Sequence, residues 1–76
     1  MLHEYGIGVD YANNIILFRT LPGFGMAAGA TLDSMQIEQM LGCVSGDDTV
    51  VIIMRSKDSA AEVCAELAKI CGKSKV

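Results

Sequence analysis

Residues 41–54 read LGCVSGDDTVVIIM, and this stretch decides the fold class. Two short runs rich in apolar and β-branched residues, Met40–Ser45 and Thr49–Met54, have the composition of strands. The residues between them are typical of tight turns, namely Gly46, Asp47 and Asp48. The stretch therefore predicts a β-hairpin that carries two adjacent carboxylates at its tip.

The sequence before this hairpin predicts a second one. Apolar side chains alternate with a glycine or an acidic residue over Ile7–Tyr11, which is the period of a half-buried strand. Asn13 and Asn14 tolerate positive φ and suit a tight turn. The run Ile15–Phe18 that follows is apolar at every position, and we expect this strand to end near Arg19.

A helix is expected after each hairpin. The first covers about residues 24–34, where Gly25 and Gly29 each weaken it by up to ~1 kcal/mol relative to alanine. Such a helix requires the close approach of a neighbouring backbone. The second follows Arg55, with Ser56 or Ser59 as its cap. Ser59 and Glu62 have capping-box spacing at its start, and Gly72 is a natural stop at its end. Between them an apolar stripe at helical spacing consists of Ala60, Val63, Cys64, Leu67, Ile70 and Cys71.

The order ββαββα predicts an α+β fold, a two-layer sandwich in which two helices cover one face of a four-stranded antiparallel sheet. Ile15–Phe18 and Val50–Met54 are apolar at consecutive positions, so both faces of these strands require burial. A solvated second face would alternate instead. We therefore expect the second face to be an interface with another copy of the chain.

Composition limits the class of protein. The 76 residues make one domain, 1–76, which buries only ~60% of its unfolded surface, and oligomerisation is a usual remedy at this size. Three cysteines without C-x-x-C spacing indicate a reducing compartment, hence the cytoplasm. His3 is the only histidine, so no metal site is expected.

Charge and hydropathy exclude two further classes. The net charge of −3 and the pI of about 4.8 do not give the basic face of a nucleic-acid-binding domain. Hydrophobic residues reach 51%, yet no run approaches the ~20 residues of a membrane span and no signal peptide is recognisable. The apolar surplus is therefore expected to be buried against protein.

Residues 23–29, GFGMAAG, satisfy the glycine pattern of dinucleotide-binding folds, and Asp47 lies roughly 20 residues further on. However, Leu21 and Pro22 separate the glycines from the preceding strand. The chain also lacks room for a crossover helix and for the two halves of a Rossmann domain. We expect no nicotinamide or flavin cofactor.

The acidic hairpin tip is the candidate site. The simplest interpretation of Asp47 and Asp48 is a solvated turn, but two neighbouring carboxylates repel unless a cation or donors lie between them. They do not suit a glycosidase pair, and they supply too few oxygens for Ca²⁺. A guanidinium or ammonium ligand fits better, because a forked donor pairs bidentately with carboxylate. Asp33 is a possible third acid, or else a solvated residue at a helix end.

The motifs TLPG (20–23), LD (32–33) and LGCVSGDDTVVII (41–53) have the order and spacing of a known family. From about Val9 to Leu67 the sequence resembles the C-terminal domain of bacterial arginine repressors. The resemblance implies a ββαββα domain that forms trimers, two of which stack into a hexamer. It also implies that L-arginine binds between the trimers as corepressor, contacted by more than one subunit.

Matching position by position, the resemblance implies that the acidic pair faces the ligand, that Asp33 is an acidic contact and that Ser45 contributes its backbone. Met26 stands where the family often has Gln or His, and a thioether cannot make the same hydrogen bond. Cys43 stands where Thr is usual. The full set of expected ligand-binding residues is Asp47, Asp48, Asp33, Ser45, Met26, Gly46 and Cys43.

In that family a winged-helix DNA-binding domain precedes this one, and the present sequence begins at Met1 without it. Operator DNA is therefore expected as a partner only through that missing part, and no membrane partner is expected. Two alternatives remain open. One is a purely structural oligomerisation module with a decayed arginine site, which Met26 favours. The other is a small enzyme, which the absence of a nucleophile–base pair argues against.

Overall fold

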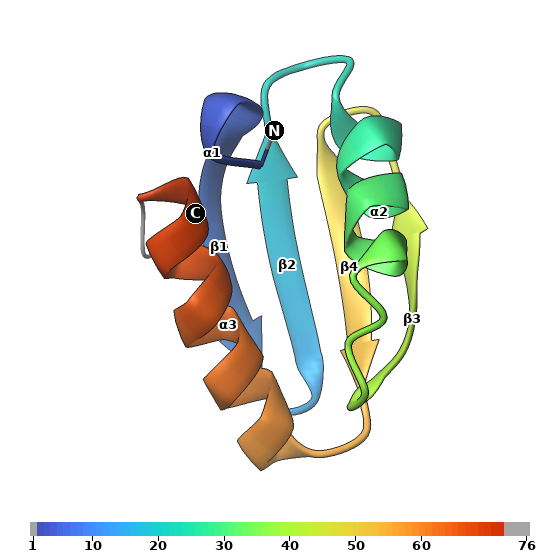
Figure 1. The fold of residues 1–76 in the computed structure, drawn as a ribbon, viewed down its shortest axis with the longest axis vertical. Helices are drawn as coiled ribbons and strands as arrows, with labels where there is room; N and C mark the ends of the chain where they lie inside the picture. Colours follow the sequence, from blue (N-terminus) through green and yellow to red (C-terminus); the bar gives the residue numbers. More distant parts are fainter. Residues whose placement is uncertain (1, 73–76) are drawn as a thin grey trace.

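The computed structural model describes residues 2–72 and confirms the predicted α+β sandwich (Figure 1). Both predicted hairpins and both predicted helices are present. In chain order, the elements are α1 (Leu2–Tyr5), β1 (Gly6–Ala12), β2 (Ile15–Thr20), α2 (Gly25–Ser34), β3 (Met40–Ser45), β4 (Thr49–Met54) and α3 (Lys57–Cys71).

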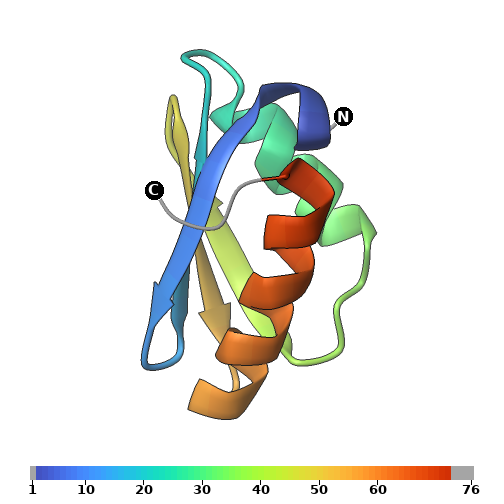
Figure 2. The ribbon, with the colours of Figure 1, turned by 90° about the vertical axis from the view of Figure 1, so that its left-hand side faces the viewer.

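The four strands form one antiparallel sheet in the order β1-β2-β4-β3. The two continuous apolar runs of the sequence therefore lie on the central strands, β2 and β4. Helices α2 and α3 cover the same face of this sheet, α3 mainly over β1 and α2 mainly over β3 (Figure 2). The opposite face carries no helix from the described part of the chain.

The core lies between the sheet and the two helices. Alternate residues of the central strands point into it, and Ile16, Phe18, Val50 and Ile52 are fully buried. The helices contribute Leu32 and Leu67, which are 0% and 1% exposed. Burying such side chains stabilises the fold by about 1.5–3 kcal/mol each.

The ends of α3 correct one prediction and confirm another. Ser56 is the N-cap: its hydroxyl accepts a hydrogen bond from the Ser59 amide at 3.1 Å, and its own amide donates to the Ser59 hydroxyl at 3.2 Å. The capping box is therefore Ser56–Ser59, and the predicted Ser59–Glu62 pair is wrong. Gly72 ends the helix in the left-handed conformation, with φ of 73°.

The apolar stripe of α3 is only partly buried. Ala60, Cys64, Leu67 and Cys71 face the core, whereas Ile70 is 41% exposed. Ile70 instead borders a small groove of about 130 Å³ that α3 forms with residues near the end of α2. Ile70 therefore belongs to the apolar stripe by its helical spacing but is not buried in the core.

Helix α1 was not predicted. Its Leu2 side chain is buried, and the ring of Tyr5 stacks on that of Phe24 with centroids 4.7 Å apart. The Tyr5 carbonyl also accepts a hydrogen bond from the Leu21 amide at 2.9 Å. These contacts hold the loop between β2 and α2, which is the loop that the acidic hairpin tip approaches.

The centre of the helix-free face of the sheet is apolar, as the sequence pattern indicated, and Asp10 and Arg19 lie on the same side of the sheet. Cross-strand neighbours Leu17 and Val51 occupy its centre and are half-buried, and Val44 beside them on β3 is 65% exposed. We call this surface, formed by Ile15, Leu17, Val44, Val51 and Ile53, the open face. Among residues 2–72 there is no helix long and apolar enough to cross a membrane.

Candidate functional site

The tip of the β3–β4 hairpin is fixed by backbone hydrogen bonds. Within the turn, the Gly46 amide donates to the Thr49 carbonyl at 2.7 Å. Across to the β2–α2 loop, the Asp47 carbonyl accepts from the Gly23 and Gly25 amides at 3.1 and 2.9 Å. The Asp48 carbonyl accepts from the Thr20 amide at 2.8 Å. The tip is therefore held by the loop and by the first residue of α2.

Two glycines of α2 allow this close approach. A Cβ atom added at Gly25 would overlap the carbonyl oxygen of Gly46, and one added at Gly29 would overlap the hydroxyl of Ser45. The expected close approach of a neighbouring backbone is confirmed at Gly25, whereas at Gly29 the close neighbour is the Ser45 side chain. The result is that the start of α2 and the hairpin tip lie side by side.

A pocket of about 300 Å³ opens where these segments meet, and it is lined by Gly23, Met26, Ser45, Gly46 and Asp47. Four of these are expected ligand-binding residues. Met26 is 76% exposed, so its thioether lies at the surface and adds no hydrogen-bond donor to the pocket. The pocket therefore combines one carboxylate, one hydroxyl and one apolar side chain.

The positive end of the α2 dipole lies beside the same pocket. Phe24 at the N-cap makes no side-chain cap hydrogen bond, and the first turn of the helix contains no acidic residue. Such a helix start favours a negatively charged group nearby. The pocket thus has a negative group from Asp47 and a partial positive charge from the helix.

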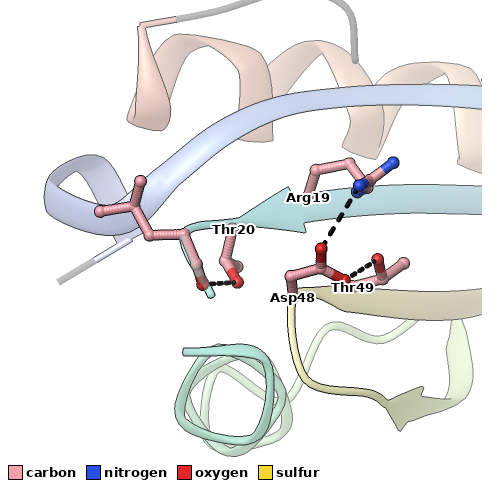
Figure 3. Close-up of polar contacts among 5 residues, drawn as sticks. Arg19, Thr20, Asp48 and Thr49 are labelled. Carbon is pink, nitrogen blue, oxygen red and sulfur yellow. Dashed lines mark hydrogen bonds and ion pairs between the residues drawn. The ribbon is translucent and has the colours of Figure 1, made fainter. Parts of the chain in front are cut away.

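The two carboxylates of the tip have different surroundings. One oxygen of Asp48 accepts a hydrogen bond from the Thr49 hydroxyl at 2.9 Å, and the other lies 3.5 Å from the Arg19 guanidinium (Figure 3). Asp48 is not among the residues that line the pocket. The Asp47 carboxylate makes no hydrogen bond or ion pair within residues 2–72. The Arg19 guanidinium and the Thr49 hydroxyl at Asp48 therefore reduce the repulsion between the two carboxylates.

Asp33 and Cys43 lie away from the pocket and contact each other. The Cys43 thiol is 3.6 Å from an Asp33 carboxylate oxygen and 3.8 Å from the Gly29 carbonyl oxygen. Burial, and after it the Asp33 carboxylate, raises the pKa of the Cys43 thiol, which favours the protonated, less nucleophilic form. Asp33 lies two helical turns, ~10 Å, along α2 from Met26. One chain therefore does not bring Asp33 to Asp47.

Sequence reasoning did not identify Arg19 as part of this region. Its partner Asp48 is 29 positions away in sequence, and the contact depends on β2 pairing with β4, which places Arg19 opposite Thr49. In the described part of the chain, no group of three or more His, Cys, Asp or Glu side chains is arranged to hold a metal ion.

Comparison with known proteins gives the family. The sequence matches the family described as "Arginine repressor, C-terminal domain" over residues 2–69. It is 44% identical to the arginine repressor of Acetivibrio thermocellus over 64 residues, which are 84% of this chain and 42% of that protein. It is 36% identical to that of Ruminiclostridium cellulolyticum over 70 residues, covering 92% and 47%.

A third relative, the arginine repressor of Lachnoclostridium phytofermentans, is 35% identical over 75 residues, which are 99% of this chain and 49% of the relative. The chain thus spans about half the length of the curated relatives that it matches. The family match covers the hairpin tip, the glycine-containing helix and both central strands. The chain belongs to the arginine repressor family and corresponds to its C-terminal domain.

Proposed function

We propose that this chain is the ligand-binding and assembly part of an arginine-responsive transcriptional regulator. The observation that carries the proposal is the Asp47 carboxylate, which has no partner among residues 2–72 and lies in a pocket built by the hairpin tip and α2. L-arginine supplies a planar forked cation, which pairs bidentately with such a carboxylate. Its aliphatic chain fits beside Met26, and its own carboxylate is favoured near the start of α2.

We further propose that a second copy completes the site. The pocket is only partly enclosed, and among its lining residues Asp47 alone carries a carboxylate, since Asp33 lies two helical turns further along α2. A neighbouring copy can bring its own acidic residue to the ligand, as the family pattern implies. A ligand shared between copies binds more tightly when they are assembled, and by linkage it stabilises the assembly.

The open face supports the assembly part of this proposal. An exposed apolar sheet face with Val44 at 65% exposure is the kind of surface that proteins cover by association. We propose that three copies bury their open faces together and that two such trimers enclose arginine, giving a hexamer. The hairpin tip lies at the end of this face, so trimer formation also positions the pockets.

Regulation requires a part of the protein outside this sequence. The relatives are named arginine repressors and are about twice as long as this chain. We propose that a DNA-binding domain in the remaining part of the protein binds the operator in the cytoplasm. Arginine bound to the present domain then acts as corepressor and controls that DNA binding at arginine genes. The role is non-enzymatic.

A specific observation favours the structural alternative. Met26 lies at the pocket and offers no hydrogen-bond donor to a ligand. A domain that has lost arginine binding but still assembles would have such a pocket and would keep its apolar open face. The two functions differ in ligand binding alone. Calorimetric titration of L-arginine into the chain separates them, with L-citrulline as the control that keeps the shape and lacks the charge.

Asp47→Asn tests the site assignment in the same titration. We expect the variant to weaken arginine binding roughly 10- to 100-fold, because a charge-assisted hydrogen bond is lost, while trimers remain intact. Asp58→Asn is the matched control, since Asp58 is an exposed carboxylate in the first turn of α3. Normal arginine binding by Asp47→Asn would show that the site is wrongly assigned.

A further inference from the structure

Arg19 occupies a particular place on the sheet. It lies on the helix-free side of β2, paired with Thr49 on β4 and Gly8 on β1. Leu17 and Val51, two residues along their strands, belong to the same side and form the centre of the open face. Arg19 is thus the charged residue at the end of that apolar surface nearest the hairpin tip.

Among residues 2–72, the Arg19 side chain makes one ion pair and leaves one buried donor without a partner. Its Nη2 atom lies 3.5 Å from the Asp48 carboxylate, between β2 and β4 (Figure 3). Its Nε atom is buried and has no acceptor among the described residues, although the side chain as a whole is 39% exposed. A buried donor without a partner is unfavourable, so folding of one copy does not satisfy this arginine.

Asp48 is committed to this contact. Both of its carboxylate oxygens have partners, Thr49 on one and Arg19 on the other, and its carbonyl accepts from the Thr20 amide. The adjacent Asp47 carbonyl accepts hydrogen bonds from the Gly23 amide in the loop and from the Gly25 amide at the start of α2. A movement of Asp48 therefore displaces the peptide that holds the pocket, although Asp48 does not line it.

We infer that Arg19 is a positioning residue that connects the open face to the arginine pocket through Asp48. Packing of a second copy on the open face excludes water from the Arg19–Asp48 pair and strengthens it, because the attraction between charges grows as the local dielectric falls. Assembly thereby fixes the tip, and Asp47 alone of the two acids faces the ligand.

The competing interpretation is an ordinary surface ion pair. Pairs with both side chains partly exposed, here 39% and 43%, contribute little to stability. In that case the loss of either partner leaves assembly unchanged. The two interpretations differ in one measurable quantity, the coupling between Arg19 and Asp48 in self-association. That quantity does not depend on arginine, whereas the effect on the pocket rests on the proposed function.

The experiment is a double-mutant cycle on the self-association constant without arginine, measured by sedimentation equilibrium. The variants are Arg19→Met, Asp48→Asn and the double variant. Arg19→Lys keeps the charge, and Arg55→Met removes a matched exposed arginine next to β4. Circular dichroism confirms that each variant is folded.

We expect each single variant to weaken self-association roughly threefold to tenfold and the double variant to be no weaker than either, as for residues in direct contact. Arg19→Lys should recover part of the loss, and Arg55→Met should have none. Additive losses, no loss, or a wild-type chain that does not self-associate would each overturn the inference. Wild-type assembly with the expected coupling but no heat on arginine titration would refute the arginine site and leave the Arg19–Asp48 connection supported.

Discussion

The two faces of the sheet carry similar apolar side chains at their centres but differ in how far one chain buries them. On the helix-covered face, Phe18 and Ile52 are completely buried within one chain. On the open face, their strand neighbours Leu17 and Val51 are only half-buried, and no helix from residues 2–72 lies over them. The difference shows that one chain fills its core with two helices and leaves an apolar surface that no helix of residues 2–72 covers.

The acidic pair lies where these two faces meet. Asp47 belongs to the pocket on the side of α2, and Asp48 reaches Arg19 on the side of the open face. Adjacent residues of the same type thus serve different surfaces. Variants on the covered face are therefore expected to change folding stability, and variants on the open face to change self-association.

The largest effect is expected on the covered face. Phe18→Ala removes a fully buried ring from the centre of the core and should lower the free energy of unfolding by about 3–5 kcal/mol. Urea denaturation followed by circular dichroism measures this loss. Val44→Ala on the open face is the control and should change the unfolding of the single chain by less than ~0.5 kcal/mol. Similar losses of stability in both variants would show that the two faces contribute equally to the folding of the single chain.

The next effect is expected on the open face. Val51→Asp places an unpaired carboxylate at the centre of that face and should weaken self-association by roughly 100-fold or more. The chain should remain folded, because the side chain points away from the helices. Sedimentation velocity measures assembly and circular dichroism measures folding. Unchanged assembly of the folded variant would show that copies do not meet through this face.

A smaller effect is expected at the junction between helix and tip. Gly25→Ala brings a methyl group against the backbone of Gly46 and should cost about 1–3 kcal/mol of stability. Gly29→Ala is the matched comparison, since its methyl group meets the Ser45 side chain, whose hydroxyl can rotate. Gly25→Ala should therefore be the more harmful in thermal denaturation and in arginine titration. The reverse order would indicate that the tip is not held by the start of α2.

The smallest effect concerns the thiols. Burial is the main cause that raises the pKa of Cys43 and of Cys64 above the ordinary value of 9.0. The folded chain thus holds these protons more tightly than the unfolded chain. Stability is therefore independent of them below about pH 9 and falls as pH rises through the raised values. Urea midpoints between neutral and strongly alkaline pH test this, and Cys43→Thr should flatten part of the decline. A decline that the variant leaves unchanged would exclude Cys43 as a contributor.

Most of the fold could be predicted because local patterns encode it. Asn13 takes positive φ, 54°, in the first turn, and Gly72 ends α3 in the left-handed conformation as its residue type indicates. Helix α1 has no such pattern, since four residues show no helical period and their position depends on the stacking of Tyr5 on Phe24. The choice between Ser56 and Ser59 as cap also required geometry, because either residue type suits the position.

The site was predictable to the extent that it is local. Ser45, Gly46 and Asp47 are consecutive, and Met26 joins them because α2 packs on the hairpin. Arg19 was missed because its contact with Asp48 depends on the pairing of β2 with β4. The continuous apolar runs contained the relevant signal, since they mark the two central strands. Placing those strands side by side would have set Arg19 opposite the residue that follows Asp48.

We expect arginine binding to be coupled to the stacking of two trimers, each of which forms through the open face. Sedimentation velocity at micromolar protein, alone, with millimolar L-arginine and with millimolar L-citrulline, tests it most directly. We expect a shift from trimer towards hexamer with arginine only, because citrulline lacks the charge that is proposed to pair with Asp47. Identical profiles under all three conditions, together with no heat on arginine titration, would show that arginine binding and trimer stacking are not coupled.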